Sequence, residues 1–289
     1  MPGKLDVWRT FALKQRPNAF ENERFNNRIL IEMSKAQTNN ESQITRVGLL
    51  GYGKMGQAID SIAADHHVEI AWRIGRDHRD DLTPALLRQA DVVIEFSRPE
   101  AAFGNVQFCL ENGLPVVSGT TGWSDRLPEA EKLCLERGGS MLWASNFSVG
   151  VNLFFALNRY LAQLMNDCEE YSPSATEIHH IHKLDAPSGT ALTLVDELIA
   201  RVDRVKGYTL RSPDNQQPIT GNQQLIPITA IRESEVPGTH LIRWASPVDE
   251  ITIEHRAHSR MGFASGAVLT AKWLVGKRGV FSMRDVLNL

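Results

Sequence analysis

Short apolar segments alternate with helical runs between residues 45 and 150, and each apolar segment ends in a small polar turn. This alternation is typical of strands buried in a parallel sheet and joined by helices that cover its faces. We therefore expect an α/β domain in this part of the chain. Its strands are expected in segments 46–50, 68–74, 91–97, 115–122 and 141–148.

The pattern changes after Gly150. An apolar helix is expected over 152–165, and a long helix of small and apolar residues over 262–275 is expected to return to the first domain. Strand-like segments lie between them and predict an α+β domain with an open mixed sheet. These segments are 174–180, 225–232, 239–245 and 249–256.

The patterns divide the chain into an extension (1–44), a first domain (45–150 plus 261–289) and a second domain (151–260). The extension has scattered polar residues, no sustained hydrophobic period and no apolar core of a secretory signal. We expect it to be a flexible extension, or the product of a start codon placed upstream of the true one.

A glycine motif follows the first expected strand directly. Gly51-Tyr52-Gly53-Lys54-Met55-Gly56 has the G-x-G-x-x-G spacing and precedes a helical run. In that context the first glycine allows a tight turn, the second lets a pyrophosphate approach, and the third lets helix and strand pack closely. The motif predicts a Rossmann-type dinucleotide-binding domain; the alternative is a glycine-rich turn of an ordinary α/β protein.

The second expected strand ends at Gly75 and Arg76, where the adenosine ribose of a bound dinucleotide would lie. NAD-specific sites usually place a carboxylate there. Gly75 stands in its place, and Arg76 could pair with a 2′-phosphate. This favours use of NADPH, although Asp77 could serve if the register differs.

The segment from Glu177 to Ala191 contains three histidines and a lysine within five positions, followed by a Pro-Ser-Gly-Thr turn and a helical run. Ser188 is a natural N-cap, so the N–H groups of Gly189 and Thr190 would lie at a helix N-terminus that favours anions. Proton-transfer groups beside an anion site indicate a small carboxylate substrate. Satisfied structural histidines and an ordinary turn are the alternative.

Composition excludes some classes of function. Lysine and arginine number 31 against 34 acidic residues, which argues against nucleic acid as the main partner. The three cysteines show no spacing typical of a disulfide or metal site, so we expect no metal and a reducing, cytoplasmic location. No apolar run approaches the length needed to span a membrane.

Several of these motifs together resemble the 4-hydroxy-tetrahydrodipicolinate reductase family, which acts in the diaminopimelate route to lysine. The resemblance runs from about Thr45 to Leu289, and its most specific part is the His-His-x-His-Lys-x-Asp-Ala-Pro-Ser-Gly-Thr run. The other segments that carry it are Gly51–Gly56, Glu95–Glu100, Gly119–Gly122, Ser145–Gly150 and Ser259–Ala267.

The resemblance implies NADPH and/or NADH as cofactor, a cyclic dicarboxylate substrate, and a homotetramer built through the sheet of the second domain. It implies that His179 is the proton donor or acceptor and Lys183 a proton donor. His180, Gly189 and Thr190 would contact the substrate. The cofactor-binding residues would be Gly51, Tyr52, Gly53, Lys54, Met55, Gly56, Gly119, Thr120, Thr121, Ala144, Ser145, Asn146 and Phe147. The end of the second strand adds Gly75 and Arg76, and Gly75 departs from the acid that many members of the family carry there.

Two other classes stay open at this point. Another two-domain dehydrogenase is one, but Cys109 and Cys168 lack the context that would activate a nucleophile for an aldehyde dehydrogenase. A non-catalytic cofactor sensor is the other, and it would not need proton donors. Arg232, Gly238 and His240 are expected in a polar loop that either closes on ligand or lies on the surface. For His182 a structural role is favoured.

Overall fold

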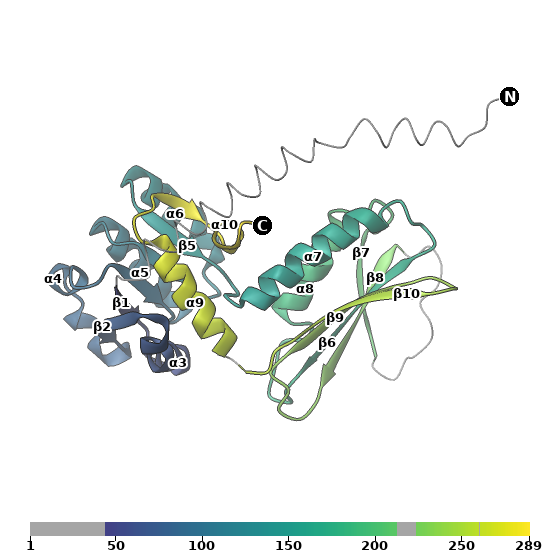
Figure 1. Ribbon diagram of the computed structural model, residues 1–289, viewed down its shortest axis with the longest axis horizontal. Coiled ribbons are helices and arrows are strands. Elements are labelled where there is room, and N and C mark those ends of the chain that lie inside the picture. Colours follow the sequence, from purple (N-terminus) through teal and green to yellow (C-terminus); the bar gives the residue numbers. More distant parts are fainter. Residues whose placement is uncertain (1–43, 213–223, 260) are drawn as a thin grey trace, which may run out of the picture. The chain divides into compact units, whose positions relative to one another are not determined.

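The computed structural model describes residues 44–212, 224–259 and 261–289. The expected extension, 1–44, lies outside the described residues except for Ile44. Residues 45–289 form one compact unit that contains two sheets (Figure 1). Among the described residues, no helix combines the length and the apolar character that a bilayer span requires.

The first sheet has six strands in the order β11-β5-β4-β3-β1-β2, and every neighbouring pair is parallel. This is the Rossmann-type sheet expected from the glycine motif. Its strands are β1 (Thr45–Leu50), β2 (Val68–Ile74), β3 (Val92–Glu95), β4 (Val116–Ser118), β5 (Ser140–Trp143) and β11 (Gly279–Phe281).

Helices cover both faces of this sheet, which explains why its inner strands are mostly apolar, whereas the edge strand β2 also carries exposed Glu69 and Arg73. Alternate residues such as Leu49 and Ile94 pack on one side with α3 and α9, while Leu50 and Val93 pack on the other with α5 and α6. The helices of this domain are α3 (Lys54–Ile62), α4 (Pro84–Leu87), α5 (Pro99–Glu111), α6 (Leu127–Glu136), α9 (Met261–Leu274) and α10 (Met283–Leu287). Short 3-10 turns are η1 (Ala64–His66), η2 (Arg76–Asp81) and η3 (Ser124–Arg126).

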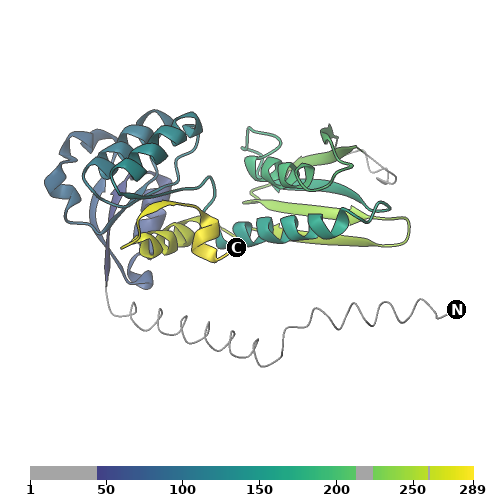
Figure 2. The same ribbon diagram turned by 90° about the horizontal axis from the view of Figure 1, so that it is seen from above.

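The second sheet has five strands in the order β10-β9-β6-β8-β7 and is mixed, as expected. β6 pairs in parallel with β8 and antiparallel with β9, so it lies at the centre. Helices α7 (Val149–Met165) and α8 (Gly189–Ile199) pack on one face (Figures 1 and 2). The strands are β6 (Ser172–His179), β7 (Gly207–Arg211), β8 (Leu225–Arg232), β9 (Thr239–Ala245) and β10 (Glu250–Arg256).

The chain returns to the first sheet after β10. Helix α9 packs against α3 and the middle strands, and β11 then pairs with β5. Small residues allow a close approach here, because a side chain on Gly266 would place its Cβ 1.8 Å from the Phe147 carbonyl oxygen. The sequence pattern did not predict β7 or β11, which are short strands at sheet edges and carry little hydrophobic signal.

Candidate active site

The glycine motif forms the turn between β1 and α3. Gly51 has a φ of +97°, and a Cβ there would lie 1.9 Å from the Phe96 carbonyl oxygen. A Cβ on Gly56 would lie 2.3 Å from the Gly51 carbonyl oxygen, so this glycine lets helix and strand pack closely. Gly53 is different, because no atom lies within 4 Å of its Cβ position. Gly53 is the N-cap residue of α3, and no side chain accepts a hydrogen bond from the first N–H groups of this helix. The open space and these free N–H groups suit a pyrophosphate.

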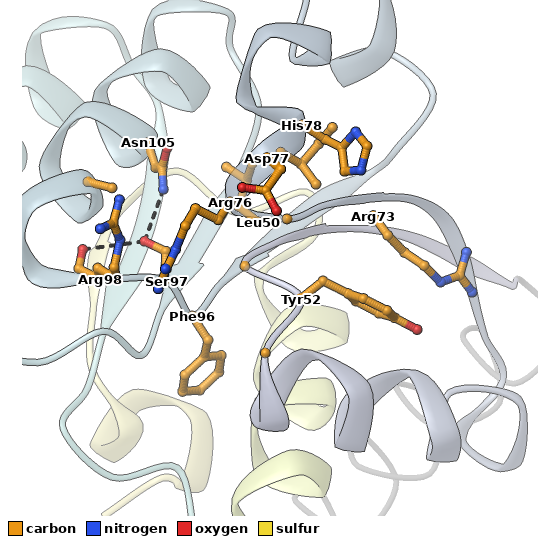
Figure 3. A pocket seen from close by; sticks show the side chains of 15 residues that line it. Leu50, Tyr52, Arg73, Arg76, Asp77, His78, Phe96, Ser97, Arg98 and Asn105 are labelled. Carbon is orange, nitrogen blue, oxygen red and sulfur yellow. Dashed lines mark hydrogen bonds between the residues drawn. The ribbon is translucent and has the colours of Figure 1, made fainter.

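A cavity of about 680 Å³ opens beside this turn (Figure 3). Gly51, Tyr52 and Gly53 line it together with Gly75 and Arg76 from the end of β2. In Figure 3 Arg76 reaches toward Ser97, on the opposite side from Tyr52 and Arg73. The cavity thus brings together the residues predicted to contact the pyrophosphate of a dinucleotide and those predicted to contact its adenosine ribose.

The two nearby arginines differ in their partners. Arg73 donates to both carboxylate oxygens of Asp60, at 2.7 and 2.6 Å, and Tyr52 donates to the same carboxylate. The hydrogen bonds from Arg73 lower the pKa of Asp60 against the effect of burial. Arg76 forms no ion pair within the described part of the chain. The guanidinium of Arg76, and not that of Arg73, is therefore available to bind an anion.

Glu95 organises the loops at the carboxyl edge of this sheet. Its side chain is fully buried and accepts from Ser118 Oγ at 2.7 Å and Thr120 Oγ1 at 2.9 Å. It also accepts from the Ser97 N–H at 3.1 Å. A buried carboxylate needs such donors, so Glu95 fixes the turns after β3 and β4. In the sequence Glu95 stands out only as part of the family resemblance, which gives it no role of its own.

A larger cavity of about 1020 Å³ combines residues from the loops of both sheets. Lys54, Met55, Thr121, Ser145 and Asn146 come from the helix and loops that follow strands of the first sheet. The segment after β6 of the second sheet contributes all five residues predicted for catalysis or substrate: His179, His180, Lys183, Gly189 and Thr190.

The remaining five residues predicted to bind cofactor line neither cavity. Phe147 is 1% exposed and packs edge-on against Phe96, with ring centroids 5.7 Å apart. Thr120 is held by Glu95, and a Cβ on Gly119 would lie 2.0 Å from the Phe96 ring. These residues pack beside the edge of the sheet and do not line either cavity. The five are Gly56, Gly119, Thr120, Ala144 and Phe147.

His179 ends β6 and lies in a prepared environment. Its Nδ1 contacts the carboxylate of Glu177, which is fully buried two residues earlier on the same strand. A Cβ on Gly238, whose φ is +153°, would lie 3.0 Å from His179 Nε2. The glycine therefore leaves room beside the second ring nitrogen. Nδ1 held by a carboxylate and Nε2 facing space is an arrangement suited to proton transfer.

Arg232 and His240 complete this cluster. Arg232 ends β8 and donates from Nη2 to Glu177 Oε1 at 2.9 Å. His240 lies in β9, is 5% exposed, and its ring packs edge-on against His179 with centroids 5.0 Å apart. The expectation of a polar loop is therefore wrong for both residues, which lie in the strands expected over 225–232 and 239–245 and face the site, whereas Gly238 lies in the loop before β9. Only the sheet register, which is set by long-range pairing, brings them beside His179.

Two groups in the cluster have displaced pKa values. Burial raises the pKa of Glu177, but hydrogen bonds from His179 and Arg232 outweigh it and lower the pKa to about 2. Burial, together with the charge of His179, lowers the pKa of His240 to about 4. Glu177 is therefore an anion and His240 neutral near pH 7.

The loop after β6 carries the other candidate groups. Lys183 Nζ pairs with both oxygens of Asp185, at 2.7 and 2.9 Å, and the pKa of Asp185 is lowered because this pairing outweighs burial. His182 is exposed, lies 3.2 Å from Glu235 and lines the same cavity as His179 and Lys183, so the structural role favoured for it stays a prediction. The strand ends at His179, one residue before its expected limit, so His180 belongs to this loop.

Helix α8 begins as the sequence pattern predicts. Ser188 Oγ accepts from the Ala191 N–H at 3.2 Å, and the same Oγ lies 3.0 Å from His240 Nε2. No atom lies within 4 Å of the Cβ position of Gly189. The first turn of the helix is thus open toward the larger cavity and close to Lys183.

Ligand atoms of Glu177, His179 and His240 lie within 4.8 Å of one another, close enough to share a metal ion. The Arg232 guanidinium on Glu177 places a positive charge there, which opposes a divalent cation. The absence of a metal stays a prediction.

Comparison with known proteins gives matches over nearly all of the described chain. Residues 45–147 match the model of the dihydrodipicolinate reductase N-terminus, and residues 150–287 match that of its C-terminus. The chain is 44% identical over 243 residues to 4-hydroxy-tetrahydrodipicolinate reductase of Christiangramia forsetii, which covers 84% of this chain and 97% of the relative. The corresponding enzyme of Neisseria gonorrhoeae is 35% identical over 233 residues, 80% of this chain and 84% of the relative.

A solved structure shares the fold. Dipicolinate-bound dihydrodipicolinate reductase from Paenisporosarcina sp. TG-14 has a TM-score of 0.68 at 22% identity, covering 83% of this chain and 98% of that one. The family resemblance found in the sequence and the two-sheet architecture are thus confirmed. The chain belongs to the dihydrodipicolinate reductase family.

Proposed function

We propose that this protein is a 4-hydroxy-tetrahydrodipicolinate reductase. It reduces 4-hydroxy-2,3,4,5-tetrahydrodipicolinate to tetrahydrodipicolinate with NADPH and/or NADH and with loss of water, in the diaminopimelate route of lysine biosynthesis. The observation that carries the proposal is the larger cavity. It is lined both by Lys54 and Met55 of the glycine motif and by the His179–Thr190 segment of the second domain.

The first domain binds the cofactor in this proposal. The open space at Gly53 and the cavity beside Gly75 and Arg76 fit a dinucleotide, since glycine admits the phosphates and Arg76 offers an unpaired cation. When bound, the nicotinamide supplies a hydride to the fourth ring carbon of the conjugated imine that forms when water leaves the substrate.

His179 transfers the proton that this reduction requires. Glu177 holds Nδ1 as a donor, so Nε2 can give or take a proton on the cavity side. Lys183 stabilises negative charge and is the second group able to donate that proton. Its pairing with exposed Asp185 is loose enough for a substrate carboxylate to compete.

The substrate's carboxylates bind at the start of α8. The N–H groups of Gly189 and Thr190 face the cavity at the positive end of an 11-residue helix, and His180 adds a further contact. A dicarboxylate ring held there lies beside His179 and Lys183.

The second domain also carries the assembly surface in this proposal. Helices α7 and α8 cover one face of its sheet, and on the other face lie half-buried residues such as Thr176, Ile178 and Leu241. We place the homotetramer contact on this second face of the sheet. We also place the enzyme in the cytoplasm, as is usual for biosynthetic reductases of this kind. Light scattering on the purified protein measures the assembly state directly.

A coupled assay tests the activity. The preceding synthase generates the unstable substrate in place, and nicotinamide absorbance is followed with NADPH and NADH side by side. Oxidation of either coenzyme that depends on the synthase product supports the reductase. A folded protein that binds coenzyme but oxidises neither one would point instead to another dehydrogenase or to a sensor.

The same assay tests the role of Arg76. Arg76→Ala should raise KM for NADPH about tenfold and leave KM for NADH nearly unchanged, because only NADPH has a 2′-phosphate to pair with the guanidinium. Arg88→Ala is a suitable control, since Arg88 is an exposed arginine of the same domain that lines neither cavity. Equal effects on both coenzymes would contradict the assigned role.

A further inference from the structure

Arg232 contacts both parts of the proposed catalytic set. It is the last residue of β8, and its side chain is 20% exposed. Nη2 donates to Glu177 Oε1 at 2.9 Å, and Nη2 and Nε donate to the carbonyl oxygens of Asp185, at 2.6 Å, and Lys183, at 3.2 Å. One planar guanidinium therefore joins the carboxylate behind His179 to the loop that carries Lys183.

Glu177 transmits the first of these contacts. Its side chain is fully buried, with Arg232 on Oε1 and His179 Nδ1 on Oε2. Parallel pairing of β6 with β8 puts Arg232 directly opposite His179, so both side chains lie on the same face of the sheet. The cation holds the carboxylate, and the carboxylate selects the tautomer of His179 with the proton on Nδ1.

The second contact concerns the loop between β6 and α8. Its start is tied by main-chain bonds, from the Ile181 N–H to the Ser234 carbonyl at 3.2 Å and from the Lys183 N–H to the His180 carbonyl at 3.1 Å. The carbonyls of Lys183 and Asp185 are held by Arg232. The position of the Lys183 main chain thus depends on the same side chain as the orientation of His179.

We infer that Arg232 is a positioning residue that couples the two proposed catalytic side chains, orienting His179 through Glu177 and fixing Lys183 through the main chain of its loop. The inference rests on the function proposed above for His179 and Lys183. It assigns Arg232 no contact with substrate.

The charges give this arrangement a signature in pH dependence. His179 is faced by Glu177 on its own strand, Arg232 on β8, His240 on β9, and Lys183 and Asp185 on the loop. Without Arg232, an uncompensated buried carboxylate favours the protonated imidazole, so the alkaline limb of the kcat profile moves to higher pH. Without the Glu177 charge the imidazolium loses its partner, and the limb moves to lower pH.

The experiment compares Arg232→Gln, Arg232→Lys and Glu177→Gln in the full-length protein. The two Gln variants should lose about ten- to a hundredfold in kcat, shift the alkaline limb in opposite directions and bind NADPH as the wild type does. Arg232→Lys should lose kcat with little shift, because an ammonium keeps the charge but cannot span the carboxylate and both carbonyls.

Arg204→Gln is the matched control. Arg204 also holds main-chain carbonyls, those of Asn166 at 2.8 Å, Tyr171 at 2.9 Å and Met165 at 3.1 Å, but it contacts neither Glu177 nor the Lys183 loop. Its replacement should lower the Tm without moving the pH profile. The inference would be overturned if all four variants, the control included, lost kcat equally and kept the wild-type dependence of kcat on pH.

Nitrogen NMR of labelled histidine gives a reading that does not depend on turnover. In the wild type the His179 signals, identified by their loss in His179→Gln, should show the proton on Nδ1. Glu177→Gln should move toward a mixture of tautomers, whereas Arg232→Gln should keep the doubly protonated imidazole to higher pH than the wild type. Unchanged signals would contradict the inference. A wild type that oxidises neither coenzyme would instead refute the proposed function, and the NMR result would still decide the role of Arg232.

Discussion

His179 differs from the neighbouring histidines in what surrounds it. Glu177 and Arg232 lie on one side of its ring and Gly238 leaves space on the other, whereas His182 is exposed beside Glu235. His179 and His182 are only three positions apart in the sequence, yet their surroundings give them different chemistry. A buried carboxylate partner distinguishes a proton-transfer histidine from one on the surface.

His179→Gln should lower kcat by about a hundredfold or more and leave the Kd for NADPH nearly unchanged, because the glutamine keeps the size of the side chain but cannot transfer a proton at neutral pH. Steady-state kinetics and a fluorescence titration with NADPH measure the two quantities. Loss of coenzyme affinity in the same proportion would rule out the assigned role.

His240 makes stability depend on pH. Its pKa falls from 6.5 in the unfolded chain to about 4 in the folded one, so the unfolded state binds more protons between these values. Folding therefore loses stability as the pH drops from about 6.5 toward 4, by as much as ~3 kcal/mol. Half-buried His255, whose pKa is lowered by burial, acts in the same direction.

His240→Gln should flatten the rise of unfolding free energy between about pH 4 and pH 6.5. Urea denaturation at a series of pH values measures this slope. His66→Gln is the control, because His66 is exposed and its removal should leave the slope as it is. A slope in His240→Gln equal to that of the wild type would show that another group titrates.

At the scale of elements, the turn between β1 and α3 uses its glycines for two purposes. Gly51 and Gly56 are required by close packing of main chain on main chain, with Cβ positions 1.9 and 2.3 Å from carbonyl oxygens. Gly53 faces open space. The structure thus separates packing from ligand access in a motif whose spacing alone cannot tell them apart.

Gly53→Ala should raise the Kd for NADPH about tenfold and change unfolding free energy by less than ~1 kcal/mol, because its methyl group enters only the space that faces the cofactor. Gly56→Ala should cost about 1–3 kcal/mol of stability, since α3 must move away from β1. Urea unfolding and coenzyme titration measure both.

Gly104→Ala serves as the control for these glycine variants. It lies on an exposed position of α5 with no atom within 4 Å of its Cβ, so alanine there should stabilise the helix slightly and leave coenzyme binding unchanged. Equal losses of affinity in Gly53→Ala and Gly104→Ala would contradict the assignment of Gly53 to the cofactor site.

At the scale of the whole molecule, both family matches and every candidate site residue lie from residue 45 onward. A chain comprising residues 45–289 should therefore keep kcat, KM and Tm close to those of the full chain. The coupled assay and a thermal melt on both forms provide the test. A large drop in either quantity would mean that the extension contributes to folding or catalysis.

The sequence by itself predicted the two sheets, the glycine turn, the Ser188 cap and the family, and these are confirmed. Each has a local signal, because strand alternation, turn glycines and helix caps act over a few neighbouring residues. For the same reason Gly189, Thr190 and Lys183 could be grouped with His179 from their adjacency alone.

Only the tertiary structure revealed what surrounds these residues. Arg232 and His240 lie 53 and 61 positions after His179 and reach it through the pairing of β6 with β8 and β9. Glu177 could be recognised as a partner of His179 only once it was seen to be buried. Strand register and burial depend on contacts among distant segments, and a local sequence pattern cannot encode which distant side chain will lie opposite another.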